Sequence, residues 1–240
     1  MGGVSTAPLL TELHAHTTWS DGMLRVAELV DVYGKAGFDV LCITDHALPS
    51  RADCLSDSIV ESRFAAYLAE VEREAARARS SYGLVVLPGL ELTLTSDDAD
   101  TAAHALALGL REFVSLDDGI DPALSAARSA GAALVAAHPS GPESLDHRAT
   151  RAWWRRFEEL RHLVDRWELI NRHTAYPWVS EARLPVVATG DFHRPEHLST
   201  WKTLLPCEKD AEAVVAFLRS PARCFLTTVE AAPTAEPLAA

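Results

Sequence analysis

The chain predicts a single α/β barrel domain, and three features of its 240 residues support that fold class. Short apolar runs alternate with amphipathic stretches of helical spacing, which is the pattern of βα units. Hydrophobic residues make up 48% of the chain, enough for one substantial core. Polar side chains follow several apolar runs, at the end of the strands where barrels of this kind carry their active sites. We expect one domain over residues 1–229 and a disordered Ala/Pro/Thr/Glu tail over residues 230–240.

The first apolar run leads into LLTELHAHTTWSDG, residues 9–22, which carries three candidate metal ligands. Side chains at positions i and i+2 share one face of an extended strand, so His14 and His16 can converge on one ion. Asp21 lies beyond the turn that follows. Taken alone, the two histidines also fit a half-buried strand, and Asp21–Gly22 fits an ordinary turn.

Helical and strand patterns alternate after this stretch. Residues 25–37 have apolar side chains at helical spacing and end at a glycine, which predicts an amphipathic helix. VLCITDH, residues 40–46, predicts a buried strand that ends in Asp45 and His46. Residues 59–82 combine alternating charges with apolar positions at helical spacing, which predicts a long surface helix.

The segment 84–110 predicts an antiparallel hairpin rather than another βαβ unit. Its first strand, LVVLPGLELT, carries Glu91 near its end, and the second run, HALALGL, begins at His104. The polar connection over residues 94–103 is too short for a crossover helix, which needs about a dozen residues or more. An antiparallel return would place Glu91 and His104 side by side.

The second half of the chain continues the pattern of strands that end in polar residues. Three strands are expected to end in His138, in Arg172, and in Asp191 with His193, respectively. The expected strands cover residues 133–138, 166–172 and 184–193, with short runs over 203–207 and 224–228. The expected helices cover residues 122–131, 153–163 and 210–218.

Composition limits the possible partners and compartment. The net charge of −12 opposes binding to a phosphate backbone, so long nucleic acid is not an expected partner. No apolar run approaches the roughly 20 residues of a membrane span, and the start MGGVSTAP lacks the basic region of a secretion signal. Four scattered cysteines fit reduced thiols. We expect a soluble, cytoplasmic protein.

Nine His, Asp and Glu side chains are expected at one rim of the barrel. Any one of them could be a solvated polar group at a strand end, but nine together favour a multinuclear metal site. Imidazole and carboxylate ligands without thiolates fit zinc, manganese or iron and do not distinguish between them. The other histidines, at positions 147, 162, 173 and 197, are expected at the surface, with His173 the first candidate for an exception. The nine candidate ligands are His14, His16, Asp21, His46, Glu91, His104, His138, Asp191 and His193.

These motifs resemble the polymerase and histidinol phosphatase (PHP) superfamily of metal-dependent phosphoesterases. HAHTTWSDG, ITDH, PGLELT, HALALGL, AAHP and GDFH occur in the family's order over about residues 9–193. The resemblance implies a distorted seven-stranded (β/α), TIM-like barrel of PHP type that holds three metal ions. Asp21 stands where some members have His. By resemblance, the first ion is bound by His14, His16, Glu91 and Asp191, the second by Glu91, His104 and His138, and the third by Asp21, His46 and His193.

The resemblance also implies a hydrolase of small phosphate esters, such as a nucleotide, sugar or histidinol phosphate. Its nucleophile would be a hydroxide that bridges two metal ions, with Glu91 and Asp191 as catalytic residues. Arg172 and Arg194 adjoin strand ends and could bind the phosphate, with a surface salt bridge as the alternative for each. We therefore expect two to three zinc, manganese or iron ions and a small phosphorylated substrate. A phosphodiesterase or short-oligonucleotide exonuclease and a non-catalytic metal-binding module are the alternatives, and the oligomeric state is left open.

Overall fold

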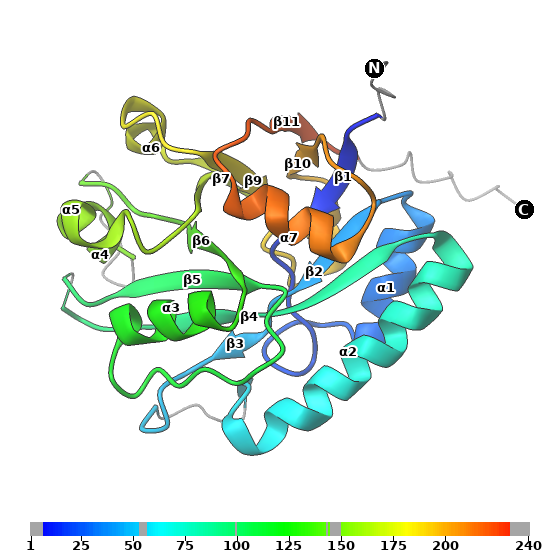
Figure 1. The fold of residues 1–240 in the computed structure, drawn as a ribbon, viewed down its shortest axis with the longest axis horizontal. Coiled ribbons are helices and arrows are strands. Elements are labelled where there is room, and N and C mark those ends of the chain that lie inside the picture. Colours follow the sequence, from blue (N-terminus) through cyan, green and yellow to red (C-terminus); the bar gives the residue numbers. More distant parts are fainter. Residues whose placement is uncertain (1–6, 53–56, 99, 143, 145–149, 231–240) are drawn as a thin grey trace, which may run out of the picture.

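The computed structural model describes residues 7–52, 57–98, 100–142, 144 and 150–230 (Figure 1). His147 and almost all of the expected tail lie outside these residues. None of the helices within them is long and apolar enough to cross a membrane.

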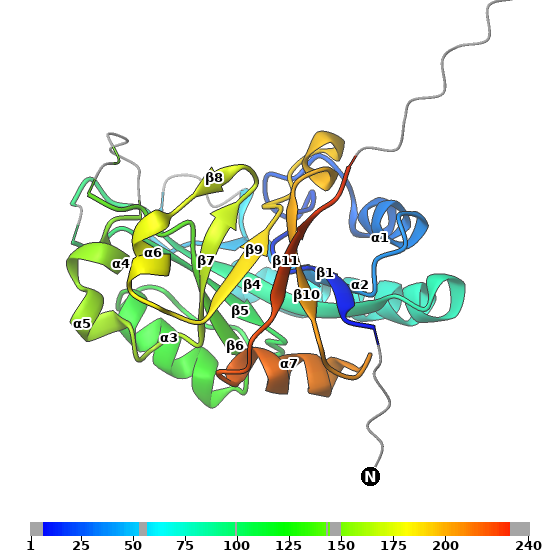
Figure 2. The same cartoon turned by 90° about the horizontal axis from the view of Figure 1, so that it is seen from above.

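A curled mixed sheet of eleven strands forms a half-barrel at the centre of the molecule (Figures 1 and 2). Its hydrogen-bonded order is β11-β10-β1-β2-β4-β5-β6-β7-β8, with β3 beside β4 and β9 beside β7. The strands are β1 (Leu9–Glu12), β2 (Val40–Ile43), β3 (His46–Ala47), β4 (Val85–Leu94), β5 (Ala103–Leu108), β6 (Ala133–Ala137), β7 (Arg166–Asn171), β8 (Thr174–Ala175), β9 (Val186–Thr189), β10 (Trp201–Leu205) and β11 (Phe225–Thr228).

The hairpin expected over residues 84–110 is confirmed. Strands β4 and β5 pair antiparallel in a register that places Thr93 opposite His104 and Glu91 opposite Leu106. Strand β5 also pairs antiparallel with β6, whereas β1, β2 and β4 are mutually parallel, as are β6, β7 and β9. The carboxyl end of β4 and the start of β5 therefore lie at the same end of the sheet as the exits of β1, β6 and β9.

The expected count of seven strands in a distorted (β/α), TIM-like barrel is not confirmed. Short strands β3 and β8 add to the sheet, and β10 pairs antiparallel with both β1 and β11. Between β9 and β10 the link is a side chain rather than a strand ladder. The Thr203 hydroxyl accepts the Ala188 N–H at 2.9 Å and donates to the Ala188 carbonyl at 2.8 Å.

All of the helices but the last cover the outer face of the curled sheet, and the last, α7 (Ala211–Arg219), packs against the inner apolar cluster (Figure 2). One helix expected over residues 153–163 is instead two short ones. The break falls at Arg156, whose backbone is not helical (φ −107°, ψ 30°). Its guanidinium pairs with Asp121 and Glu159. The helices are α1 (Val26–Lys35), α2 (Glu61–Tyr82), α3 (Ile120–Ser129), α4 (Ala152–Arg155), α5 (Phe157–Leu160), α6 (Pro177–Glu181) and α7 (Ala211–Arg219), with a 3-10 turn, η2 (Pro195–Leu198).

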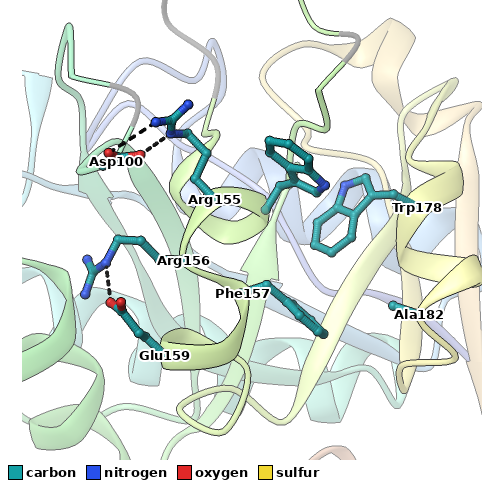
Figure 3. Close-up of a pocket in the computed structure, with 8 residues that line it drawn as sticks. Asp100, Arg155, Arg156, Phe157, Glu159, Trp178 and Ala182 are labelled. Atoms are coloured by element: carbon teal, nitrogen blue, oxygen red, sulfur yellow. Dashed lines mark hydrogen bonds and ion pairs between the residues drawn. The ribbon is translucent and has the colours of Figure 1, made fainter.

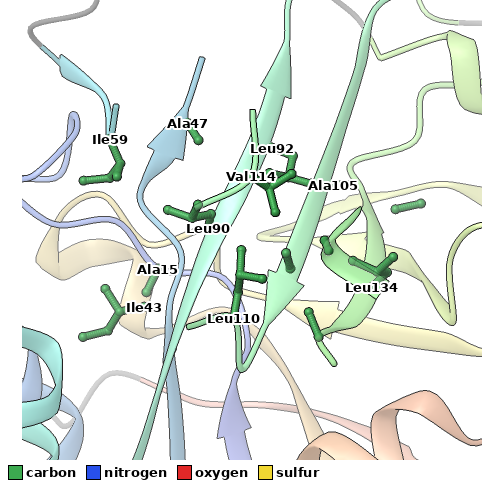
Figure 4. Packing of buried hydrophobic residues seen from close by; sticks show 14 of the residues in the cluster. Ala15, Ile43, Ala47, Ile59, Leu90, Leu92, Ala105, Leu110, Val114 and Leu134 are labelled. Atoms are coloured by element: carbon green, nitrogen blue, oxygen red, sulfur yellow. The ribbon is translucent and has the colours of Figure 1, made fainter. Parts of the chain in front are cut away.

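Strand alternation divides the core into two apolar clusters. Leu41 and Ile43 point outward to the helices, in the cluster that also holds Leu90 and Leu134 (Figure 4). Their neighbours in the chain, such as Cys42, point into the half-barrel, where the second cluster includes side chains of α7. The polar residues that follow the strands are thus carried on a core that is largely apolar.

Candidate metal centre

The chain after β1 stays extended and presents two histidines to the same side. Ala15 forms an isolated parallel bridge with Phe192, in which the His16 N–H donates to the Phe192 carbonyl at 2.8 Å. The Phe192 N–H donates in turn to the His14 carbonyl at 3.0 Å. This pairing joins the first candidate ligands to the segment that carries Asp191 and His193.

A first group of candidate ligands is almost completely buried. The Nε2 atoms of His14 and His16 each lie 3.4 Å from Glu91 Oε2. Each also lies 3.6 Å from Asp191 Oδ1. Neither Nε2 atom has a hydrogen-bond partner among the described residues. Buried polar atoms are nearly always satisfied, so two unpartnered imidazole nitrogens directed at two carboxylates fit a bound metal ion.

A second group shares Glu91 with the first. Glu91 Oε1 lies 3.1 Å from His104 Nδ1 and 3.0 Å from His138 Nε2, while its Oε2 faces the first group. The hairpin register brings His104 here, and His138 follows β6 with a left-handed φ of 30°. Oε1 of this carboxylate therefore faces His104 and His138, whereas Oε2 faces His14 and His16 and also lies 2.9 Å from His46 Nδ1.

A third group surrounds Asp21 at the more exposed edge. Asp21 Oδ1 lies 3.5 Å from His46 Nε2, and Oδ2 lies 3.2 Å from His193 Nε2. His16 Nδ1 is 3.8 Å from Asp21 Oδ1, so this ring lies between the first and third groups. The structure thus brings all nine candidate residues together, and it adds His16 to the set implied for the third ion.

The charges of the three groups are strongly coupled. Burial opposes protonation of His46, but Glu91 and Asp21 raise its pKa to about 10. The pKa of His193 rises to about 9 against burial because of Asp191 and Asp21. The imidazoles hold the pKa values of Glu91 and Asp191 well below their usual range, although burial alone would raise them. These carboxylates are ionised at neutral pH, as metal ligands must be.

Glu168 is a buried carboxylate beside the candidate ligands that the sequence analysis did not single out. It is fully buried, and its Oε1 accepts the Nδ1–H of His14 at 2.9 Å. Its Oε2 accepts the backbone N–H of His138 at 2.5 Å and the Asn171 amide at 2.9 Å. A carboxylate at Nδ1 fixes the tautomer that leaves the Nε2 lone pair free for a metal. The available signal was a glutamate inside the apolar strand RWELIN.

One further polar residue supports the loop after β1. Asp45 accepts hydrogen bonds from the backbone N–H and hydroxyl of Thr17, both at 2.8 Å, and from the Ser20 hydroxyl at 2.7 Å. It therefore shapes the loop that carries Asp21 and is not one of the candidate ligands.

The expectation of a surface position for His197 was wrong. The turn η2 folds back onto the preceding loop, which buries this ring and places its Nδ1 3.1 Å from the His193 nitrogen, where it accepts the N–H. His162 and His173 are exposed, so the exception among these histidines is His197 rather than His173.

The two candidate phosphate-binding arginines differ in position. Arg172 Nη2 lies 3.0 Å from Asp191 Oδ2 and 3.1 Å from His193 Nδ1, with the side chain 37% exposed. Arg194 is 61% exposed, contacts His197 Nε2 at 3.2 Å and lies 3.9 Å from Glu196. The structure places Arg172 against the cluster and Arg194 one layer further out.

One cavity borders the cluster and a second lies among the helices α4, α5 and α6. The first, of about 910 Å³, is lined in part by Thr93 and Thr95, whose hydroxyl oxygens lie 2.8 Å from His46 Nδ1 and 3.3 Å from His104 Nε2.

The other cavity has a volume of about 710 Å³. It lies between α4, α5 and α6 and is lined by Phe157, Trp178 and the Arg155–Asp100 pair (Figure 3). It contains none of the nine residues, although the Trp178 indole donates to the carbonyl of Pro139, next to His138.

The sequence model of the PHP domain matches residues 12–176, more than half of the chain. The chain belongs to the PHP domain family. Seven of the nine candidate ligands lie within the matched residues, whereas Asp191 and His193 follow them in the chain. No curated protein sequence matches the chain.

Solved structures with the same fold are distant in sequence. A two-domain protein from Bacteroides vulgatus, which contains a predicted PHP-like metal-dependent phosphoesterase, superposes with a TM-score of 0.72 at 19% identity. That match covers 94% of this PHP chain and 66% of the two-domain protein, just under two thirds of its length. PsfC from Pseudomonas syringae gives a TM-score of 0.57 at 15% identity, with 93% of both chains covered.

A third similar structure is an amidohydrolase from Chromobacterium violaceum with bound sulfate and no metal. It gives a TM-score of 0.51 at 16% identity, with 76% of this chain and 87% of that chain covered. At these identities the likeness establishes the fold alone.

Proposed function

We propose that this PHP-domain protein is a metal-dependent phosphoesterase that hydrolyses small phosphate monoesters. One observation carries the proposal: two buried Nε2 atoms without partners, on His14 and His16, face the carboxylates of Glu91 and Asp191. Family membership and the PHP-like phosphoesterase within the similar two-domain protein support the same class of reaction.

The three groups divide the ligands of a trinuclear site. The residues that would hold zinc, manganese or iron are His14, His16, Glu91 and Asp191 for the first ion, Glu91, His104 and His138 for the second, and Asp21, His46 and His193 for the third. When bound, such ions would supply a hydroxide nucleophile near neutral pH and neutralise charge on the phosphoryl oxygens.

The protein's own groups have separate tasks in this proposal. Glu91 acts as the shared carboxylate, since its two oxygens face different imidazole groups. Glu168 holds the proton at His14 Nδ1. Arg172 is the candidate for binding the phosphate, because its guanidinium lies at the cluster and is partly exposed. Arg194 has the weaker claim, since its contacts are to His197 and Glu196.

The cavity beside Thr93 and Thr95 could hold a small leaving group. Hydroxyl groups line its inner side, and its wall includes the carboxylate residues Asp98, Asp117 and Asp118. An acidic wall disfavours a polyanionic chain, in line with the net charge of −12. These features favour a phosphomonoester over an oligonucleotide.

A metal assay combined with a substrate panel tests the proposal. Protein expressed with added metal should contain two to three equivalents by elemental analysis and lose turnover after chelation. The panel compares p-nitrophenyl phosphate, mononucleotides and sugar phosphates with bis-p-nitrophenyl phosphate and a short oligonucleotide. Faster cleavage of the diester or oligonucleotide would support the phosphodiesterase alternative. Bound metal without turnover of any ester would support a non-catalytic module.

A further inference from the structure

A buried ion pair lies directly beneath the candidate metal centre. Glu12, the last residue of β1, and Lys202 of β10 are 3.0 Å apart, and both side chains have 0% exposure. A buried ion pair is weak evidence for stability, because desolvation of both charges offsets their attraction. The contacts of the pair indicate a different role.

The Glu12 carboxylate holds the backbone of two ligand-bearing segments. Its Oε1 accepts the backbone N–H groups of Leu13 at 3.1 Å, His14 at 3.2 Å and Gly190 at 2.8 Å. His14 is itself a candidate ligand, and Gly190 immediately precedes the candidate ligand Asp191. One oxygen atom therefore ties together the segments that supply opposite sides of the first group.

The backbone at Asp191 needs such support. Its φ of 42° lies in the left-handed region, which residues other than glycine rarely adopt unless the surrounding structure holds them there. The preceding glycine leaves room for the support, since a Cβ on Gly190 would lie 2.2 Å from Glu12 Oε2 and 2.5 Å from Lys202 Nζ.

The lysine extends the same support to the third group. Lys202 Nζ contacts the Thr200 hydroxyl at 2.5 Å and the His197 carbonyl at 3.3 Å. The His197 ring in turn accepts the backbone N–H of His193. Tyr33 donates its hydroxyl to Glu12 Oε2 at 2.9 Å, which completes the contacts of the carboxylate.

We infer that Glu12 and Lys202 are positioning residues of the metal centre. They fix the backbone at His14 and over residues 190–193, so that the side chains of His14, Asp191 and His193 meet. Glu12 and Lys202 themselves touch neither the ions nor the substrate. The inference rests on the metal binding proposed above and is independent of which ester is hydrolysed.

Two double variants of equal charge isolate this role. E12Q/K202M keeps an oxygen acceptor for the three N–H groups, whereas E12L/K202M removes it, and neither leaves an unpaired buried charge. We expect E12L/K202M to bind Zn²⁺ at least about tenfold more weakly than E12Q/K202M, the range typical of residues that orient metal ligands. Affinity is measured by competition with a fluorescent chelator, and circular dichroism confirms that both proteins are folded.

A second ion pair provides the matched control. Asp165 pairs with Arg128 at 3.0 Å and also accepts a backbone N–H, from Leu134 at 2.8 Å, but it contacts none of the nine ligands. D165L/R128M and D165N/R128M should therefore bind Zn²⁺ equally.

A third variant, Gly190→Ala, tests the positioning role if E12L/K202M does not fold. The added Cβ displaces the Glu12 carboxylate while both charges are retained, so Gly190→Ala should also bind Zn²⁺ at least about tenfold more weakly.

Equal Zn²⁺ affinity in the wild type and in the folded variants of Glu12 or Gly190 would overturn the positioning role. A wild-type protein that binds no Zn²⁺ or Mn²⁺ would instead overturn the proposed function. The two failures are thus distinguishable.

Discussion

Glu91→Gln is the substitution that most directly probes how the candidate site works. Glu91 is fully buried and lies between the first two groups, with Oε1 3.0–3.1 Å from His138 and His104 and Oε2 3.4 Å from His14 and His16. Glutamine keeps the shape of the side chain and removes its charge. A single change therefore weakens both groups at once.

The expected loss follows from the size of one charge interaction. A unit charge about 4 Å from another contributes about 4 kcal/mol at an effective dielectric constant of about 20. A loss of about 4 kcal/mol of transition-state stabilisation corresponds to about a thousandfold in rate. We therefore expect kcat to fall by at least about a thousandfold, together with the metal content, while the fold is retained.

The assay measures turnover of p-nitrophenyl phosphate, metal content and circular dichroism on the same preparations. Glu74→Gln is the control, since Glu74 is nearly buried on the outer helix α2 and pairs with Arg77 at 2.6 Å, remote from the site. It should lower stability without changing kcat. If Glu91→Gln retains its metal and near-normal turnover, Glu91 is not shared between two ions and the assignment of the first two groups is wrong.

Three further predictions address other parts of the site. His193→Ala should raise KM with a smaller fall in kcat than Glu91→Gln, because it removes one ligand of the third group only; a larger fall would move His193 into the centre that generates the nucleophile. Arg172→Ala should raise KM for a phosphomonoester about tenfold, as loss of a charge-assisted hydrogen bond does, whereas Arg194→Ala should change it little; the reverse order would reassign the phosphate contact. In chelator-treated protein, His46 and His193 have raised pKa values of about 10 and about 9. Their contribution to stability is therefore complete below about pH 6.5 and is lost as pH rises through 9 to 10, so Tm should decrease over that range; a constant or rising Tm would contradict the coupling.

The positions of the candidate ligands could be predicted from the local sequence because strand geometry fixes the direction of their side chains. The i, i+2 spacing of His14 and His16 and the short connection before His104 each led to a placement that the structure shows. The prediction of an antiparallel hairpin was the decisive one. If β5 were parallel to β4, His104 would lie at the opposite end of the sheet from Glu91.

The residues that hold the candidate ligands in place could not be predicted from the sequence, because their partners lie far away in the chain. Glu12 and Lys202 are 190 positions apart in the chain, and Glu168 and His14, which share a hydrogen bond, are 154 positions apart. A single glutamate in an apolar strand does not indicate which loop it will contact. The 3-10 turn that buries His197 and the break at Arg156 likewise depend on tertiary contacts rather than on periodicity.

Anomalous diffraction from crystals grown with Zn²⁺ or Mn²⁺ tests the central claim most directly. The account predicts anomalous density between the Nε2 atoms of His14 and His16 and the carboxylates of Glu91 and Asp191. Further density is expected between Glu91, His104 and His138, and beside Asp21. Crystals of a metal-loaded protein with no anomalous density among these residues would contradict it.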